Sequence, residues 1–139
     1  MGKINLGRVI LGGLVAGLII NIGEFVLNEP ILGQQWIAAM ESLNRSPIGN
    51  NAIAVFVVGA FILGITMIWT YAAMRPRMGA GPSTAICAGL LVWFFVYLYP
   101  APGLIAMDLF PRNLLLLTVV WGFFELPIAA LAGAWLYQE

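Results

Sequence analysis

The chain has 139 residues, of which 62% are hydrophobic and only 9% are charged, whereas soluble domains carry roughly 25% charged residues. This composition indicates an integral membrane protein whose main surroundings are a lipid bilayer. Six basic and six acidic residues cancel. The basic residues lie at the ends of apolar segments and form no long run, so we expect no nucleic acid among the partners.

Chemistry-bearing side chains are few. Histidine is absent, which removes the commonest metal ligand and the commonest general base. No nucleophile, base and orienting group can be assembled from the remaining residues. We therefore expect a protein that is not an enzyme and that holds no metal and no cofactor, with a bound lipid as the one small-molecule option.

Four apolar segments have the length of a membrane span, since about 20 apolar residues cross a bilayer as a helix. The sequence predicts spans at residues 9–27, 52–74, 83–99 and 113–137. The third span is expected to stop before Pro100 and Pro102, because proline removes a backbone donor and disfavours helix in the residue before it. The fold class that follows is an all-α, four-helix bundle in the membrane, with residues 1–139 forming a single domain.

Two connections are longer than a turn. The segment ILGQQWIAAMESLN, residues 31–44, carries Trp36, Met40 and Leu43 at helical spacing, which is typical of a short helix lying in the membrane interface. The segment PAPGLIAMDLFPRN, residues 100–113, mixes apolar residues with prolines and is expected to re-enter or to lie along the same surface. Together the two connections are predicted to cap the outer end of the bundle.

Basic residues are distributed unequally between the two sides of the predicted spans. Four lie on one side and two on the other: Lys3, Arg8, Arg75 and Arg77 against Arg45 and Arg112. The positive-inside rule then places both termini in the cytoplasm, and we expect a multi-pass protein of the bacterial inner membrane. Arg8, Arg75 and Arg77 are also candidates for contacts with anionic lipid headgroups, although orientation and snorkelling explain their positions more simply.

Polar residues interrupt the first apolar segment at a depth where a membrane helix is normally apolar. Asn21, Glu24 and Asn28 are three and four residues apart and therefore share one face of a helix. In the last span, Glu125 lies near the middle, where an ionised carboxylate costs roughly 2.5 kcal/mol or more. Lipid exposure would leave both carboxyl groups without partners. We therefore expect all four side chains to form one polar cluster inside the bundle.

Small residues extend both polar stripes at spacings of three and four. They are Gly13 and Gly17 in the first span, and Gly122, Ala129 and Gly133 in the last. Because small side chains let helix backbones approach closely in lipid, we expect these positions to lie at helix contacts.

Three roles are open for the polar cluster. In a structural role, a protonated Glu125 donates a hydrogen bond to Asn21 or to a backbone carbonyl and holds the first and fourth helices together. In a functional one, Glu24 and Glu125 form a proton or cation site, or the polar end of a lipid or quinone pocket. In the third, another chain completes the site.

The order of motifs resembles a bacterial family of small four-helix integral membrane proteins of unknown function. The resemblance is carried by ILGQQWIAAMESL after the first span, two central spans, and LFPRNLLLLTVVWGFFELPIAALAGAWL at the end. In that family a glycine and a tryptophan follow the first helix, and the last helix ends in small residues and tryptophan. The resemblance covers most of the chain and implies the fold. It implies no activity, and Glu24 and Glu125 are not matched to a feature of the family.

Small size, the lack of catalytic groups and the small-residue helix faces favour an accessory subunit. The sequence therefore predicts a non-catalytic accessory or structural subunit of a larger membrane complex, such as an energy-converting or oxidase complex, with other integral membrane subunits as partners. The alternative is a small homo-oligomeric proton-coupled transporter, or a lipid- or quinone-binding membrane protein, that uses Glu24 and Glu125.

Overall fold

The computed structural model describes residues 2–138, and within that range every regular element is a helix. In chain order these are α1 (Leu6–Val26), the π-helical turn η1 (Leu27–Ile31), α2 (Gly33–Ser42), α3 (Asn50–Met78), α4 (Pro82–Trp93), the π-helical turn η2 (Phe94–Leu98), α5 (Pro100–Ala106) and α6 (Arg112–Trp135).

Four continuous helical stretches are long and apolar enough to cross a membrane: Leu6–Ile31, Asn50–Met78, Pro82–Ala106 and Arg112–Trp135. The prediction of four helical spans is confirmed in this sense, and the protein is a multi-pass membrane protein by the length and composition of its helices.

The sequence signals explain several of the boundaries. Asn5 caps α1 by accepting a hydrogen bond from the Arg8 backbone N–H, and Gly79 and Gly81, both at positive φ, form the connection from α3 to α4.

The predicted end of the third span is wrong, because the helix continues past both prolines to Ala106. Pro100 and Pro102 occupy the first turn of α5, where a missing backbone N–H is tolerated. The turn before them widens into the π-form, in which the Tyr99 N–H donates to the Phe94 carbonyl at 2.7 Å. This extra residue in the turn gives the prolines room without breaking the helix.

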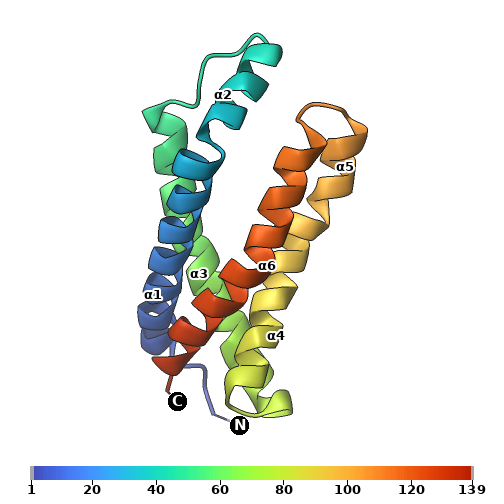
Figure 1. Ribbon diagram of the computed structural model, residues 1–139. Helices are drawn as coiled ribbons and strands as arrows, with labels where there is room; N and C mark the ends of the chain where they lie inside the picture. Colours follow the sequence, from blue (N-terminus) through green and yellow to red (C-terminus); the bar gives the residue numbers. More distant parts are fainter. Residues whose placement is uncertain (1, 139) are drawn as a thin grey trace.

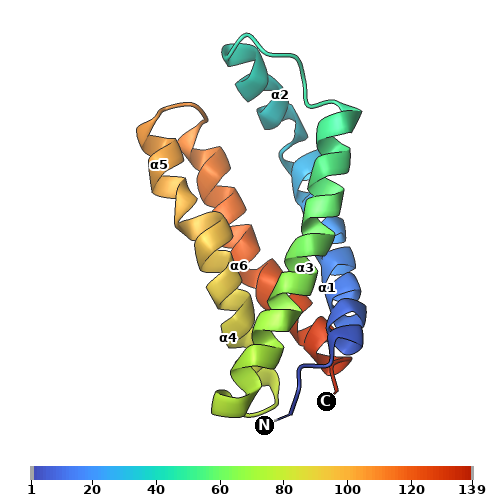
Figure 2. The same ribbon diagram turned by 180° about the vertical axis from the view of Figure 1, so that it is seen from behind.

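The helices form two arms that cross at one end and diverge at the other. Helix α1 packs mainly against α3, and α4 packs mainly against α6. Figures 1 and 2 show the two pairs as the sides of a V, with both chain termini at the narrow end. Helix α2 extends beyond α1 on one arm, and α5 extends α4 on the other. Each connection prolongs its own arm, but the two meet through side chains: the Trp36 ring contacts the Phe110 ring edge-on at 5.7 Å, beside a buried cluster of Leu27, Leu32, Ala39 and Leu114. Whether this end lies in the membrane interface stays a prediction.

Glycines bring the helix backbones into contact toward the narrow end. A side chain at Gly17 would lie 2.7 Å from the Cα atom of Phe61 on α3, and one at Gly133 would lie 2.6 Å from the carbonyl oxygen of Gly12. Across from Gly17, a side chain at Gly64 would overlap the backbone of α1. Contacts this close are available only to residues without a side chain.

The five predicted packing positions all lie against other helices, but they do not share one partner. Gly13 and Gly17 face α3, and Gly133 faces α1. Gly122 lies under the ring of Tyr97, and Ala129 is fully buried. Helix α1 is therefore packed on two sides, with α3 on one and α6 on the other.

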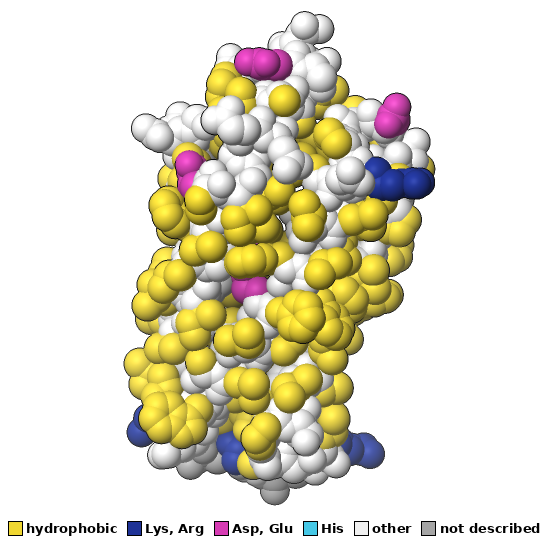
Figure 3. All heavy atoms as spheres, viewed as in Figure 1, with side chains coloured by type: hydrophobic (Ala, Val, Ile, Leu, Met, Phe, Trp, Pro, Cys, Tyr) yellow, Lys and Arg dark blue, Asp and Glu magenta, His cyan; other side chains and the backbone are white. Residues whose placement is uncertain are grey.

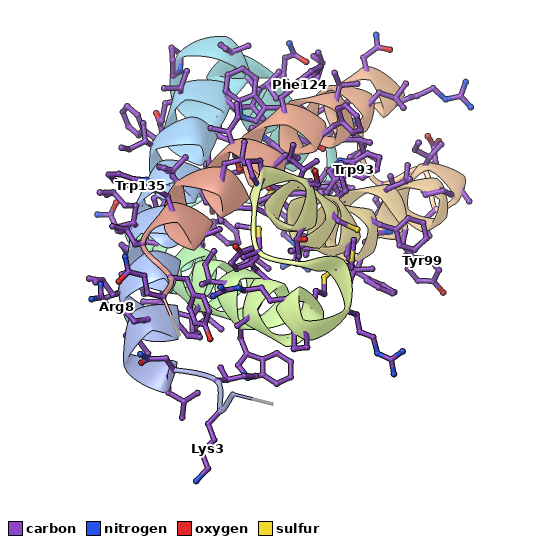
Figure 4. The ribbon with its side chains drawn as sticks, turned by 90° about the horizontal axis from the view of Figure 1, so that it is seen from below. Lys3, Arg8, Trp93, Tyr99, Phe124 and Trp135 are labelled. Carbon is purple, nitrogen blue, oxygen red and sulfur yellow. The ribbon has the colours of Figure 1, made fainter. Side chains whose placement is uncertain are left out.

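The surface between the two ends is apolar. Large side chains such as Val55 and Phe25 are more than half exposed. In Figure 3, hydrophobic side chains cover the middle of the molecule, while most charged ones gather at its two ends. Figure 4, seen from the narrow end, shows Lys3, Arg8 and Trp135 pointing away from the helices. This distribution matches a protein whose middle contacts lipid.

Replacing Gly17 with leucine tests the glycine contacts. We expect Gly17→Leu to lower the folded yield and the melting temperature in mild detergent, because overpacking of a close contact typically costs about 1–3 kcal/mol. The matched control is Gly59→Leu in α3, where an added side chain meets nothing within 4 Å. Equal yield and equal melting of the two variants would mean that α1 and α3 are not in contact at this point.

Candidate functional site

A chain of polar side chains lies where the two arms begin to separate. It starts on η1, where the Asn28 Nδ2 donates to both the backbone carbonyl and the carboxylate Oε2 of Glu24, each at 2.8 Å. Trp36 on α2 donates its indole N–H to the Asn28 Oδ1 at 2.8 Å. Asn28 therefore fixes the Glu24 carboxylate from one side and is itself held in place by the next helix.

Tyr97 brings the opposite arm to Glu24. It lies on η2, and its hydroxyl donates to the Glu24 Oε1 at 2.5 Å. Its ring crosses α6 at Gly122, where an added side chain would lie 2.8 Å from a ring carbon. Gly122 is thus the position that lets Tyr97 pass over α6 and reach α1.

Glu125 enters the same place from α6. It is one of the few buried charged or polar side chains in the described part of the chain, with 7% of its surface exposed. Its Oε2 accepts a hydrogen bond from the Trp121 indole N–H at 2.7 Å, one helical turn away. On α1 the carboxyl group lies directly against Gly23, where any side chain would overlap it.

The two carboxyl groups approach each other. Glu125 lies against Gly23, the neighbour of Glu24 in the chain, and Tyr97 connects the two places by donating to Glu24 and lying over Gly122, close to Glu125 on α6. The Glu125 Oε1 is buried and accepts no hydrogen bond from any described group. Two ionised carboxylates in a low-dielectric interior repel strongly. A single proton between them would remove that repulsion and would also give Oε1 its partner.

The donors around this carboxyl pair are neutral: Tyr97 and Asn28 for Glu24, and Trp121 for Glu125. A cationic partner would favour the charged form of both carboxyl groups, whereas these neutral donors add no charge to the pair.

Asn21 does not belong to the cluster, contrary to the sequence prediction. Its Nδ2 donates to the Val57 carbonyl on α3 at 3.3 Å, so no bond joins it to Glu125. The reason is its position on α1. Asn21 lies one turn above Gly17 and faces α3, whereas Glu24 faces Tyr97 of the other arm and holds Asn28 beside it.

Sequence reasoning missed four members of the site: Gly23, Trp36, Tyr97 and Trp121. Trp36 was expected only in an interfacial helix, and Tyr97 and Trp121 were not predicted as site residues, because aromatic residues are common in membrane spans and at their ends. The sequence did contain one signal for the site, which is a proline two residues after Asn28 and another three residues after Tyr97. In both places the π-helical turn that accommodates the proline carries the polar side chain, and such turns are frequent at functional sites.

The predicted headgroup-binding arginines are at the narrow end. Arg8 and Arg77 lie at the ends of α1 and α3. The Arg75 guanidinium lies over the rings of Tyr71 and Tyr137, at 5.9 and 5.1 Å from the ring centres. Because cation–π contacts hold it there, Arg75 takes part in packing the C-terminal end of the chain onto α3.

A groove of about 570 Å³ runs between α1 and α6 beside the carboxyl pair. Its walls are apolar except for Gly23, Trp121 and Glu125. Comparisons of the chain with protein-family models, with curated proteins and with solved structures found no match. What the site can do therefore follows from its own chemistry, which is that of a carboxyl pair held by neutral donors next to an apolar groove.

Removing the Tyr97 hydroxyl tests the link between the arms. We expect Tyr97→Phe to lower the free energy of unfolding by roughly 0.5–1.7 kcal/mol, the range for hydrogen bonds between membrane helices. The control is Tyr99→Phe, because Tyr99 is 70% exposed and its change should cost less than about 0.5 kcal/mol.

A double-mutant cycle assigns the effect of Tyr97→Phe to its partner. In a Glu24→Gln background, part of the loss should disappear, because the charged acceptor is already gone. Strict additivity of the two changes would show that Tyr97 and Glu24 do not interact.

Proposed function

We propose that this protein is a small proton-coupled membrane transporter in which Glu24 and Glu125 form the proton site. The observation that carries the proposal is the approach of two carboxyl groups from different arms, both within the membrane-spanning stretches, with neutral donors around them. Intramembrane carboxyl groups that face a protein interior are typical of proton relays in pumps and transporters.

The position of the pair couples its protonation to the shape of the molecule. Glu24 belongs to the α1–α3 arm and Glu125 to the α4–α6 arm. With one proton between them, the carboxyl groups hydrogen-bond and hold the arms together. With both ionised, their repulsion pushes the arms apart. A proton therefore favours one arrangement of the arms over the other, which is the requirement for coupling.

The narrow end provides a closed side for such a transporter. Ile20, Met67, Ile68 and Leu126 are almost completely buried there, and the glycine contacts of α1 lie beside them. At the other end, the helix backbones diverge above the carboxyl pair (Figures 1 and 2), and a cluster of buried side chains, Leu27, Leu32, Ala39 and Leu114, packs between them. In the proposed cycle this cluster separates and closes again as one arm rocks against the other, which would alternate access.

For orientation, we propose that the narrow end faces the cytoplasm of a bacterial inner membrane. Lys3, Arg8, Arg75 and Arg77 belong to this end together with both termini, and the positive-inside rule favours that side. The wide end, with Arg45 and Arg112, would then face outward.

Single cysteines test this orientation in a Cys87→Ser background. We expect a membrane-impermeant thiol reagent to label Glu41→Cys in intact cells and to label Met78→Cys only after the cells are opened. Both positions are exposed, so access is decided by the side of the membrane. The reverse labelling pattern would invert the model.

Spin labels on the two arms test the coupling. With labels at Glu41 and Met107, we expect the inter-arm distance, measured by pulsed electron resonance in nanodiscs, to increase as the pH is raised. The physical reason is that the doubly ionised pair repels. In Glu24→Gln and Glu125→Gln the distance should not change with pH, because a single carboxyl group has no charged neighbour to repel.

The matched control is Glu29→Gln. Glu29 is exposed on η1, five residues from Glu24, and has no part in the pair. In this variant the inter-arm distance should increase as the pH is raised, as it does in the unmodified protein. A constant distance in the unmodified protein, or a pH response that survives in both pair variants, would contradict the proposed proton site.

An accessory subunit of a larger membrane complex is the second candidate. The exposure of α3 favours it. In the most apolar 18-residue stretch of α3 only 22% is buried, against 44% in the corresponding stretch of α6. An exposed span of this kind offers surface to another integral membrane subunit as readily as to lipid. Purification from the native membrane in gentle detergent distinguishes the two, since an accessory subunit should co-purify with fixed partners in constant ratio.

A further inference from the structure

The groove between α1 and α6 is an apolar channel that opens on the side of the molecule. Its walls include Ile22, Leu27 and Ile31 on one side, and Val120, Phe124 and Ile128 on the other. Most of these side chains are about half exposed or more, so the groove opens toward the bilayer. Its volume of about 570 Å³ lies in the range of roughly 300–1,000 Å³ that is usual for small-molecule sites.

The only ionisable side chain among the residues that line the groove is Glu125. Figure 3 shows an acidic patch at mid-height, enclosed by hydrophobic side chains, on the face where α1 and α6 meet. Glu125 is 7% exposed, and its Oε1 accepts no hydrogen bond from the described residues. Opposite it, Gly23 contributes no side chain, so nothing from α1 stands between the groove and the carboxyl group.

Two aromatic residues flank that carboxyl group in the wall of the groove, Trp121 and Phe124. Aromatic faces attract organic cations, most strongly where water is excluded. A carboxylate, a tryptophan and a phenylalanine in an apolar groove therefore favour a hydrophobic cation. An anion would be repelled by Glu125, and a neutral hydrocarbon would leave that carboxyl group unsatisfied.

We propose that this groove binds a hydrophobic organic cation, which enters sideways from the bilayer and displaces the proton of the carboxyl pair. The inference rests on the proposed proton site and names its substrate class. The exchange balances, because one proton leaves for the aqueous phase as one monovalent cation takes its place beside the carboxylate. The net charge of the site stays at one negative charge, because the cation balances one of the two carboxylates as the proton did before.

Tetraphenylphosphonium and tetraphenylborate provide a test, since the two ions have the same shape and opposite charge. Equilibrium binding is measured on the full chain in nanodiscs of neutral lipid, with empty nanodiscs subtracting partition into the bilayer. We expect saturable binding of the cation and none of the anion. Cation binding should weaken as the pH falls, because the proton and the cation compete for one site.

Two variants locate the binding. Glu125→Gln should weaken cation binding by about tenfold or more, because it removes the charge that the cation pairs with. Val120→Trp should also weaken it, because the larger ring fills the groove. Leu116→Trp is the control for a bulky change on the same helix, since Leu116 is exposed to a similar degree but does not line the groove.

Each outcome has one meaning. Equal binding of the two ions, binding that survives both Glu125→Gln and Val120→Trp, or displacement of the cation by a neutral lipid alone would overturn the assignment. If the arms respond to pH in the unmodified protein while the cation fails to bind, the proton site stands and the cation groove is wrong. If neither is observed, both proposals fail.

Discussion

The approach of two carboxyl groups from different arms is the constraint around which the middle of this molecule is organised, because two ionised carboxylates repel each other where the dielectric constant is low. Glu24 and Glu125 come from different arms, and each is held by neutral donors, the Tyr97 hydroxyl and the Trp121 indole among them. A lysine or arginine at either place would neutralise the pair permanently. In the proposed mechanism the pair carries a proton when the arms are held together, so its protonation and the separation of the arms are linked.

Reaching this geometry requires helices that depart from the regular α-form at two places. Asn28 and Tyr97 each lie in a π-helical turn, and Pro30 and Pro100 lie within or just after these turns. A wider turn accommodates a proline and also rotates the neighbouring side chains relative to the helix below. The prolines that would be expected to end the spans thus help to place the polar side chains that face the opposite arm.

Glycine has two separate uses along α1. Toward the narrow end it lets backbones touch, at Gly12 against Gly133 and at Gly17 against Phe61. Higher up, Gly23 leaves space for the Glu125 carboxyl group. Glycine thus permits close helix packing at the narrow end and leaves space for a carboxyl group farther along α1. The groove between α1 and α6 begins where the first use gives way to the second.

The sequence by itself determined the number of spans, the two intramembrane carboxyl groups and the small residues at helix contacts, because these depend on hydropathy and on helical period alone. It predicted Glu24 and Asn28 on one helix face, and they are hydrogen-bonded there. Only the tertiary structure decided that Asn21 turns to α3, that the third helix passes its prolines, and that Tyr97 crosses Gly122 to reach Glu24. Those outcomes depend on where two arms diverge. That point is set by contacts between residues more than 70 positions apart in the chain, and no local pattern records them.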